Sequence, residues 1–449
     1  KAVVFGTTIL GSNPSAPAIK MNKISLNNSF IKKIKKIFFP FYKAKDISNI
    51  FDIFEKEEPK NKKIAMFVGG CVRKYLLKED IDDIDIATIL SPEQIKKKFK
   101  LTNIKVIETG VDHGSLTLLV NSSKFEVTTL RKDIKTDGRH AEIDFTDDWH
   151  EDSKRRDFTI NAIYLDRKGN IFDPQSGAND LEKSKVKFIG DPSKRIEEDY
   201  LRIIRFIRFS IQYNNTDFDE ETLKAIKLNL NGIKNLSKER ILNELLKIIK
   251  LENFYKILNN DDLKNIFLLI FPEFKFVNRL KKISILKKNK ILKLDSSIIL
   301  ASLIIDDKDN YQYFSHKYKV SNELKKNLLF FSEAFKNYKI EKNYFKKDLK
   351  KNIYFLGKKF IKKIAIFSFL ENINLKESEL VNILNKIEKT SFPNFSYNGE
   401  YLKKKGIEEG KKIGEALKEL EDKWVKSDFS LSDDDANIII EKVKKNQIY

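Results

Sequence analysis

Short apolar runs of strand length, broken by Gly, Asp and Asn, fill the chain between about residues 64 and 165. Residues 121–123, Asn-Ser-Ser, separate two of these runs and predict a hairpin. The alternation predicts a compact domain that combines helices with a sheet. Its predicted strands are residues 64–68, 84–89, 116–120 and 125–130, and its predicted helices include residues 72–77 and 92–99.

Beyond about residue 192 the pattern changes to long stretches of helical period with almost no strand signal. Residues 196–211 and 238–251 are the clearest predicted helices, and Ser237 is a suitable N-cap for the second. Lys-rich amphipathic segments such as residues 346–369 dominate the C-terminal part. The sequence therefore predicts an α/β or α+β head domain followed by a helical region.

The composition limits the classes of function. The 449 residues include 86 Lys and Arg against 65 Asp and Glu, a formal net charge of +21. This surplus favours nucleic acid as a partner, and a Lys-rich proteome is the alternative explanation. The single cysteine excludes an intramolecular disulfide and a Cys-based zinc or iron–sulfur centre. No apolar run reaches the roughly 18 residues that a membrane span needs.

The N-terminal residues differ from the rest of the chain. Residues 1–20 precede Met21 and combine a short apolar run with Ser, Pro and Ala. We interpret them as upstream or non-native sequence rather than a signal peptide, because they lack a charged region of normal length. Residues 21–63 are predicted to be a basic helical lead-in. Within it, residues 22–45 contain no acid, so an organellar transit segment is an alternative to a bacterial cytoplasmic location.

A glycine pair, Gly69 and Gly70, directly follows the first predicted strand and precedes Arg73. Backbone without side chains lets an anion approach the N–H groups at a helix start, and a guanidinium can bind a phosphate with two donors. The motif is compatible with phosphate binding, and an ordinary glycine turn is the alternative.

Paired acids lie on the second predicted strand. Asp83 and Asp85 are two positions apart, so they project to one face while Ile84 and Ile86 enter the core. Two carboxylates this close repel unless a hard cation lies between them, and Mg²⁺ bound to nucleotide phosphates is the usual partner. A solvated edge strand is the alternative. Glu126 would complete a triad of carboxylates if its strand neighbours this one.

A third motif carries two adjacent guanidinium groups. Arg155 and Arg156 suit a triphosphate, and Asp157 and Asn161 in the same motif suit ribose hydroxyls. A solvated basic turn explains the motif equally well.

The fourth motif begins with Glu198 and continues through Asp199 to Arg202. On a helix, Asp199 and Arg202 are one turn apart and share a face. An ordinary intrahelical salt bridge has the same geometry.

With the four motifs in this order, the chain resembles the class II nucleotidyltransferases, the family of bacterial and mitochondrial CCA-adding tRNA nucleotidyltransferases and bacterial poly(A) polymerases. The resemblance runs from about residue 67 to residue 251. It implies an α+β fold, in which a mixed-sheet nucleotidyltransferase head is followed by an all-α neck, body and tail. The implied domains are the head at 64–165, the neck and body with a base-reading helix at 166–275, and a Lys-rich, tRNA-binding tail at 276–449.

The resemblance implies a Mg²⁺-dependent enzyme that adds CCA to the 3′ end of tRNA from CTP and ATP without a template and releases pyrophosphate. The implied metal ligands are Asp83 and Asp85, with Glu126 as a further catalytic acid. A flexible element is implied around Asp137, Gly138 and Arg139. The implied nucleotide-binding residues are Gly69, Gly70, Arg73, Arg155, Arg156, Asp157, Asn161, Asp199, Arg202 and Arg205.

The resemblance assigns the reading of the base to Asp199 and Arg202. Cytosine and adenine each offer an exocyclic amino donor beside a ring-nitrogen acceptor, so one carboxylate and one guanidinium satisfy either base. Uracil and guanine present the reverse order and leave both protein groups unpaired. A pair of protein side chains can thus select C and A.

One position departs from the family pattern, which usually has Asp after the Arg of the glycine motif, whereas this sequence has Lys74. If that acid helps to place the nucleotide or the metal, Lys74 lowers the efficiency of catalysis. Within the family, a poly(A) polymerase or an enzyme that adds only the terminal A is the alternative function. A catalytically silent RNA-binding protein on the same fold is less suitable, because clustered carboxylates without a metal would repel phosphates.

Overall fold

The structure is a computed structural model that describes residues 40–445, with gaps at 61, 138–139, 289–294, 307, 341–343 and 373. The predicted upstream segment, residues 1–20, and residues 21–39 of the predicted lead-in lie outside the described residues. The chain divides into two compact units. The first comprises residues up to 131, 145–152 and 161–174, and the second comprises residues 132–144, 153–160 and 175 onward.

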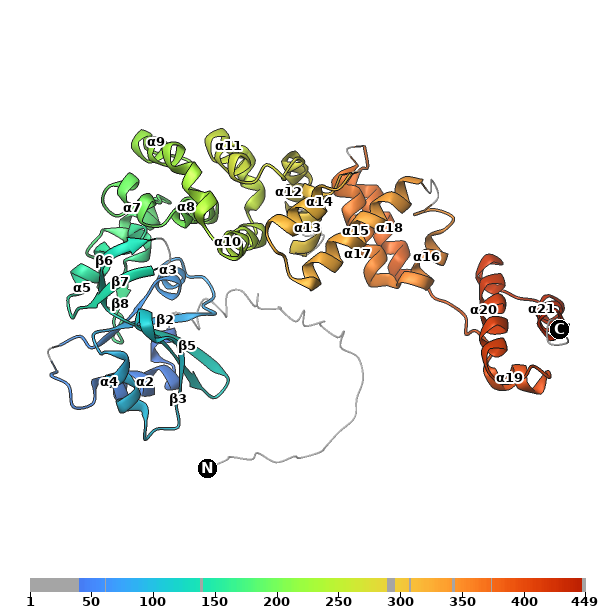
Figure 1. Cartoon of the computed structure of the whole chain (residues 1–449), viewed down its shortest axis with the longest axis horizontal. Coiled ribbons are helices and arrows are strands. Elements are labelled where there is room, and N and C mark those ends of the chain that lie inside the picture. The colour runs from blue at the N-terminus through green and yellow to red at the C-terminus, as the bar shows by residue number, and fades with distance from the viewer. Residues whose placement is uncertain are drawn as a thin grey trace, which may run out of the picture. The chain divides into compact units, whose positions relative to one another are not determined.

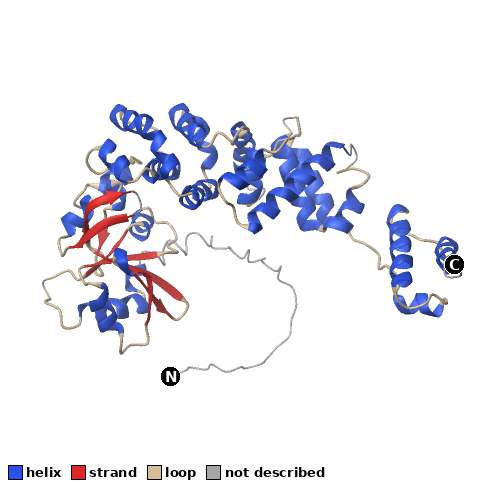
Figure 2. Cartoon of the chain, in the orientation of Figure 1, coloured by secondary structure: helices blue, strands red, loops and turns tan. Residues whose placement is uncertain are grey.

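A seven-stranded mixed sheet forms the centre of the first unit (Figure 2). The strand order is β3-β4-β5-β2-β1-β8-β9, in which β2 and β5 are parallel and every other neighbouring pair is antiparallel. The strands are β1 (Ala65–Val68), β2 (Ile84–Thr88), β3 (Lys105–Gly110), β4 (Ser115–Val120), β5 (Ser123–Thr129), β8 (Tyr164–Leu165) and β9 (Ile171–Phe172).

Helices α2 (Lys45–Glu55) and α4 (Pro92–Phe99) cover one face of this sheet (Figure 1). The ring of Phe51 on α2 lies 4.7 Å from that of Phe67, which pairs with Ile86 across β1 and β2. Because alternate strand residues project to opposite faces, Asp85 lies on the other face, away from these two helices. Burial of the aromatic and aliphatic side chains therefore fixes the face on which the acids lie.

The predicted strands and the hairpin are confirmed, and Asn121 turns the hairpin with a φ of 54°. Sequence patterns missed β3, β8 and β9. The polar, half-exposed β3 lacks a clear alternation, and β8 and β9 have two residues each. The sheet continues to β9, past the predicted head boundary at residue 165.

The second unit is almost entirely helical beyond residue 175 (Figures 1 and 2). It also holds a separate hairpin of β6 (Arg131–Asp137) and β7 (His140–Phe145), and α5 (Trp149–Lys154) spans the boundary between the units. Its helices are α6 (Gly177–Glu182), α7 (Pro192–Glu198), α8 (Leu201–Tyr213), α9 (Glu220–Asn229), α10 (Lys238–Lys250), α11 (Asp261–Ile270), α12 (Leu280–Lys288), α13 (Ser296–Ile304), α14 (Asn310–Lys317), α15 (Asn322–Ile340), α16 (Leu349–Leu356), α17 (Lys358–Glu371), α18 (Glu377–Lys389), α19 (Gly399–Lys404), α20 (Lys411–Lys426) and α21 (Asp433–Lys445).

The single helix predicted over residues 196–211 is wrong. Helix α7 ends at Glu198, Asp199 is extended with φ −157° and ψ 103°, and α8 begins at Leu201. The break is packed against a distant residue. The Tyr200 ring lies so close to Gly232 that a Cβ at position 232 would come within 2.1 Å of the ring. The Asp199 carboxylate also accepts the Leu201 N–H at 3.1 Å at the start of the next helix.

The predicted helix at residues 238–251 is confirmed as α10, and Ser237 caps it by accepting the Arg240 N–H. The amphipathic stretch at residues 346–369 is two helices, because Gly357 adopts a φ of +80° between α16 and α17. In the part of the chain that the structure describes, no helix has the length and apolar character that crossing a bilayer requires.

Candidate active site

The glycine bend and the paired acids lie side by side in the first unit. Gly69 has φ +74° and ψ −128°, a conformation that L side chains rarely adopt. A Cβ at this position would lie 3.2 Å from Asp85 Oδ2, so the carboxylate rests directly against the bend. A side chain at position 69 would be strained by this φ and would push the carboxylate away from the backbone.

The sheet brings a second acid level with Asp85. In the parallel pairing of β2 with β5, Asp85 lies opposite Glu126, and paired residues project to the same face. The condition set for Glu126, that its strand neighbours β2, is therefore met. Asp83 immediately precedes β2 and is exposed, as is Glu126. Among the described residues, no group of three or more Asp, Glu, His or Cys side chains is arranged to hold a metal.

Helix α3 (Gly70–Leu76) begins at the glycine bend and carries Arg73. Arg73 is only 8% exposed and donates from Nη1 to Asn161 Oδ1. Two residues predicted separately as nucleotide ligands, 88 positions apart in sequence, are thus in direct contact.

Lys74, the departure from the family pattern, forms an ion pair with Asp82. The hydrogen bond from Lys74 is the main reason that the pKa of Asp82 lies below its usual value. Asp82 directly precedes the predicted metal ligand Asp83, so Lys74 contacts the segment that carries the acids.

In the second unit, the backbone of the paired arginines is held by a residue that sequence patterns did not single out. Arg195 donates from Nη2 to the carbonyl oxygens of Arg155 at 2.5 Å and Arg156 at 2.7 Å. Asp157 accepts from Arg205 Nε at 2.6 Å, which joins two further predicted nucleotide ligands. Burial lowers the pKa of Arg205, but attraction by Asp157 and Glu244 outweighs it and raises the pKa above the usual value.

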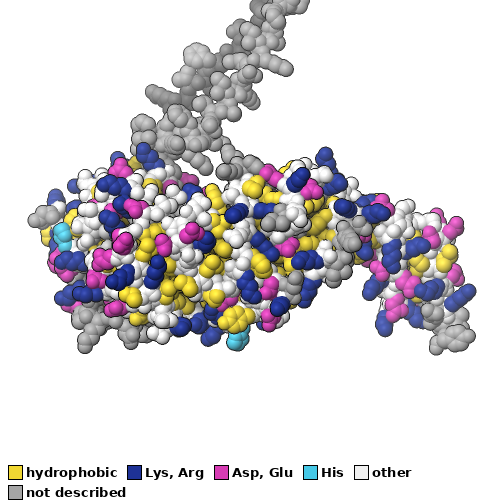
Figure 3. All heavy atoms as spheres, turned by 90° about the horizontal axis from the view of Figure 1, so that it is seen from above, with side chains coloured by type: hydrophobic (Ala, Val, Ile, Leu, Met, Phe, Trp, Pro, Cys, Tyr) yellow, Lys and Arg dark blue, Asp and Glu magenta, His cyan; other side chains and the backbone are white. Residues whose placement is uncertain are grey.

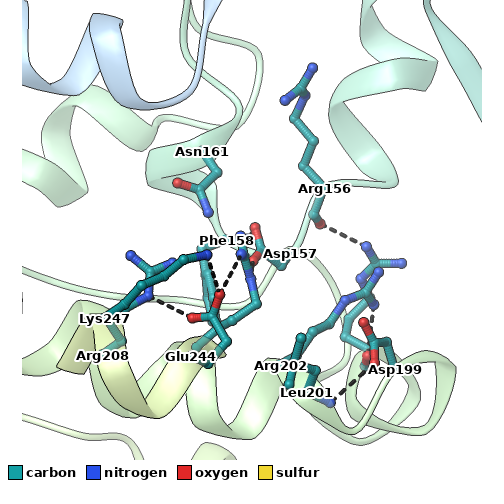
Figure 4. A network of polar contacts seen from close by, with 12 residues as sticks. Arg156, Asp157, Phe158, Asn161, Asp199, Leu201, Arg202, Arg208, Glu244 and Lys247 are labelled. Carbon is teal, nitrogen blue, oxygen red and sulfur yellow. Dashed lines mark hydrogen bonds and ion pairs between the residues drawn. The ribbon is translucent and has the colours of Figure 1, made fainter. Parts of the chain in front are cut away.

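Asp199 and Arg202, the predicted base-reading pair, are labelled in Figure 4, and each has its own hydrogen-bond partners. Asp199 Oδ2 accepts from Arg240 Nη2 at 2.7 Å. Arg202 Nη1 donates to the Glu198 carboxylate and to the carbonyl oxygen of Arg195, the latter at 2.7 Å. The alternative of a simple salt bridge between Asp199 and Arg202 is therefore not what the structure contains.

A buried carboxylate lies behind this group of side chains. Glu244 on α10 is 3% exposed and accepts from Arg208 Nε at 2.7 Å and Lys247 Nζ at 2.8 Å (Figure 4). Burial raises the pKa of Glu244, but the neighbouring arginines Arg208 and Arg205 outweigh it and hold the pKa below the usual value. The cations of α8 are thus fixed by a charged residue on a different helix.

Only one residue of the predicted flexible element lies within the described part of the chain. Asp137 ends β6, whereas Gly138 and Arg139 lie outside the described residues. Its role in the enzyme stays a prediction.

Three residues that hold the predicted ligands received no role from the sequence, namely Arg195, Arg240 and Glu198, although Glu198 begins the fourth motif. The spacing Arg195, Glu198, Arg202 is a helical charge pattern that could have indicated the first two. Arg240 lies 41 positions from Asp199 in sequence, and no local pattern connects them.

Two family models match the chain. The Poly A polymerase head domain matches residues 65–187, and a domain described as the probable RNA and SrmB-binding site of polymerase A matches residues 216–277. The chain therefore carries a head domain of the poly(A) polymerase type in residues 65–187.

Similar proteins narrow this class. The mitochondrial CCA tRNA nucleotidyltransferase 1 of Mus musculus is 33% identical over 433 residues, which cover 92% of this chain and 94% of the mouse protein. The CCA-adding enzyme of Staphylococcus haemolyticus is 39% identical over 210 residues, which cover 45% of this chain and 51% of that enzyme. The chain belongs to the CCA tRNA nucleotidyltransferase family, which confirms the resemblance inferred from the motifs.

Solved structures agree with the predicted fold class. The Bacillus stearothermophilus CCA-adding enzyme in complex with CTP has a TM-score of 0.64 at 20% identity, covering 89% of this chain and 97% of that one. The Thermotoga maritima CCA-adding enzyme complexed with tRNA has a TM-score of 0.58 at 21% identity, covering 93% and 98%. At these identities the likeness concerns the fold, and it confirms a mixed-sheet head followed by helices.

Proposed function

We propose that Asp83 and Asp85 hold the Mg²⁺ with which this chain adds CCA to the 3′ end of tRNA from CTP and ATP. The observation that carries the proposal is the Asp85 carboxylate resting against the Gly69 bend. The donors suit the ion, because Mg²⁺ prefers hard oxygen ligands and is usually bound by one or two carboxylates together with substrate phosphates. When bound, Mg²⁺ neutralises the charge of the triphosphate and of the leaving pyrophosphate.

The residues around the acids suit a triphosphate. At Gly69 and Gly70 the backbone carries no side chain, so a phosphate can approach it closely. Arg73, held in place by Asn161, supplies a fixed positive charge at the same bend. On the adjoining strand, Glu126 is level with Asp85 and adds negative charge that favours the binding of a cation.

The second unit supplies the proposed selection of the base. The Asp199 carboxylate and the Arg202 guanidinium offer an acceptor and a donor, which together match cytosine and adenine. Arg240 binds the Asp199 carboxylate and Glu198 binds the Arg202 guanidinium, so Asp199 and Arg202 do not need to pair with each other.

Helices beyond residue 216 are the proposed RNA-binding part, since one family model with an RNA-binding description covers residues 216–277. Figure 3 shows Lys and Arg side chains spread among Asp and Glu over the visible face, without one dominant patch. Contacts of this kind bind phosphates and recognise the shape of a folded RNA rather than its sequence. The similar proteins include mitochondrial and bacterial enzymes, so a bacterial cytoplasm and an organelle matrix are both retained as locations.

One experiment tests the reaction and its alternatives. Purified protein is given tRNA transcripts that end before CCA, after C and after CC, each with a single nucleotide. We expect CTP to extend the first two transcripts and ATP to extend only the third. Extension of the third transcript alone would show an A-adding enzyme, and long A tracts on all three would show a poly(A) polymerase.

A second experiment tests the metal assignment. Asp83→Ala should abolish incorporation and leave tRNA binding, measured by filter retention, nearly unchanged. Asp147→Ala is the matched control, because Asp147 is a similarly exposed acid of the first unit that pairs with Lys62. Full activity in Asp83→Ala would refute the assignment, and equal loss in both variants would show a general effect of charge.

A further inference from the structure

Lys74 occupies a position between the glycine motif and the acids. It lies on α3 immediately after Arg73, and its Nζ donates to Asp82 Oδ1. The same Asp82 oxygen also accepts the backbone N–H of Asp83 at 3.0 Å. A continuous chain of hydrogen bonds therefore runs from the Lys74 ammonium to the backbone of a proposed metal ligand.

Helix α3 contacts the acid-bearing segment at two points. Near its start, the buried Cys71 Sγ lies 3.7 Å from the carbonyl oxygen of Asp85. One turn further, Lys74 reaches Asp82, whose side chain is 70% exposed. Asp83 lies between these two points and before the start of β2, so the sheet ladder does not hold it directly.

We propose that Lys74 is a positioning residue that fixes the backbone at Asp83 through Asp82, and that residues 74 and 82 act as a pair of opposite charges. This inference rests on the proposed role of Asp83. It gives the departure from the family pattern a physical meaning. An Asp at position 74, the family's usual residue, would face the Asp82 carboxylate and repel it.

From the family pattern alone, Asp at position 74 would be expected to keep or improve activity, whereas a paired role of residues 74 and 82 predicts a loss. Lys74→Asp, which introduces the usual residue, should lower kcat about tenfold or more, because small displacements of catalytic groups cost up to about a hundredfold in rate. Asp82→Lys should have a similar effect, since it opposes two cations. The double variant Lys74→Asp with Asp82→Lys should recover to within about threefold of the original kcat, as a reversed pair restores attraction.

The matched control is the ion pair of Lys96 with Glu108 in the same unit. Its two charged atoms are 2.6 Å apart, and its side chains are about as exposed as those of Lys74 and Asp82. Lys96→Asp, Glu108→Lys and their combination should leave kcat unchanged. For every variant, kcat and KM for CTP, the Mg²⁺ concentration at half-maximal rate, Mn²⁺ binding by electron paramagnetic resonance and the thermal unfolding midpoint are measured. We expect the single variants at 74 and 82 to weaken Mn²⁺ binding and lower kcat with little change in the unfolding midpoint or in KM for tRNA.

Three outcomes would overturn the proposal: an unchanged kcat in Lys74→Asp, a double variant no better than the worse single variant, or an equal loss in the Lys96 controls. Failure of the metal assignment is separable from these results. If Asp83→Ala is fully active, the proposed function fails. If Asp83→Ala is inactive while Lys74→Asp is unaffected, only the positioning role fails.

Discussion

Arg202→Ala tests the reading of the base most directly. The Arg202 side chain is 11% exposed and uses Nη1 for its contacts with Glu198 and with the carbonyl oxygen of Arg195. Within the described part of the chain, the structure contains no other hydrogen bond from this guanidinium, and the proposed role assigns its Nε and Nη2 donors to the base. The substitution removes these donors and leaves Glu198 with its second partner, Arg195.

The size of the effect follows from those donors. A hydrogen bond from a charged group contributes about 1.5 to 3 kcal/mol, and about 1.4 kcal/mol corresponds to a factor of ten. Arg202→Ala should therefore reduce the preference for CTP over UTP by about 10- to 150-fold. Most of this change should come from a lower kcat/KM for CTP. The kcat/KM for UTP should rise little, because the substitution only removes a donor that faces a donor of uracil.

The assay is single-turnover incorporation of each nucleotide into a tRNA transcript that ends before CCA, from which kcat/KM is obtained. Arg279→Ala is the matched control, because Arg279 is a 15% exposed guanidinium of the same unit that stacks on Phe276 and pairs with Glu371. An unchanged ratio of CTP to UTP in Arg202→Ala would refute the base-reading role. An equal change in Arg279→Ala would attribute the effect to general loss of structure.

Further predictions concern stability and reactivity. Glu244→Ala should lower the free energy of unfolding of the helical unit, measured with urea, by about 3 kcal/mol. This is the lower end of the range for breaking a buried ion pair, because one partner of Glu244, Lys247, is exposed. The pKa of Glu244 is lower in the folded state, so its contribution is complete above the ordinary Glu pKa and should fade as the pH falls through the folded value; Glu244→Ala should flatten the acid side of the stability curve. Burial raises the pKa of Cys71 to about 11, so iodoacetamide at pH 8 should label it only after unfolding; rapid labelling of native protein would contradict this.

Local patterns were sufficient to place the glycine bend and the acids of β2 in the head. Alternating Asp and Ile specify which side of β2 is buried, and glycines after an apolar strand specify a bend, because both depend only on neighbours in sequence. Whether the strand of Glu126 neighbours β2 was left open by the sequence, and the structure shows that it does, with Asp85 opposite Glu126. The metal role of these acids stays a prediction.

Long-range packing decided what local patterns could not. Residues 196–211 have continuous helical periodicity, yet the helix breaks at Asp199, next to Tyr200, whose ring packs against Gly232 more than 30 positions later. The contact of Arg240 with Asp199 likewise spans 41 positions. Such contacts have no local signal, so their residues are found only once the helices are placed.

The break in the helix supports the proposal that Asp199 and Arg202 read the base. On an unbroken helix, Asp199 and Arg202 would be one turn apart and would satisfy each other, so a base would have to compete with an existing salt bridge. In the structure, the extended Asp199 turns to Arg240, and Arg202 turns to Glu198. Each group is held in place by a partner that leaves part of its hydrogen-bonding capacity unused. In the proposed role, selectivity for C and A depends on keeping the carboxylate and the guanidinium apart. We predict that any change that lets them pair weakens the binding of both correct bases.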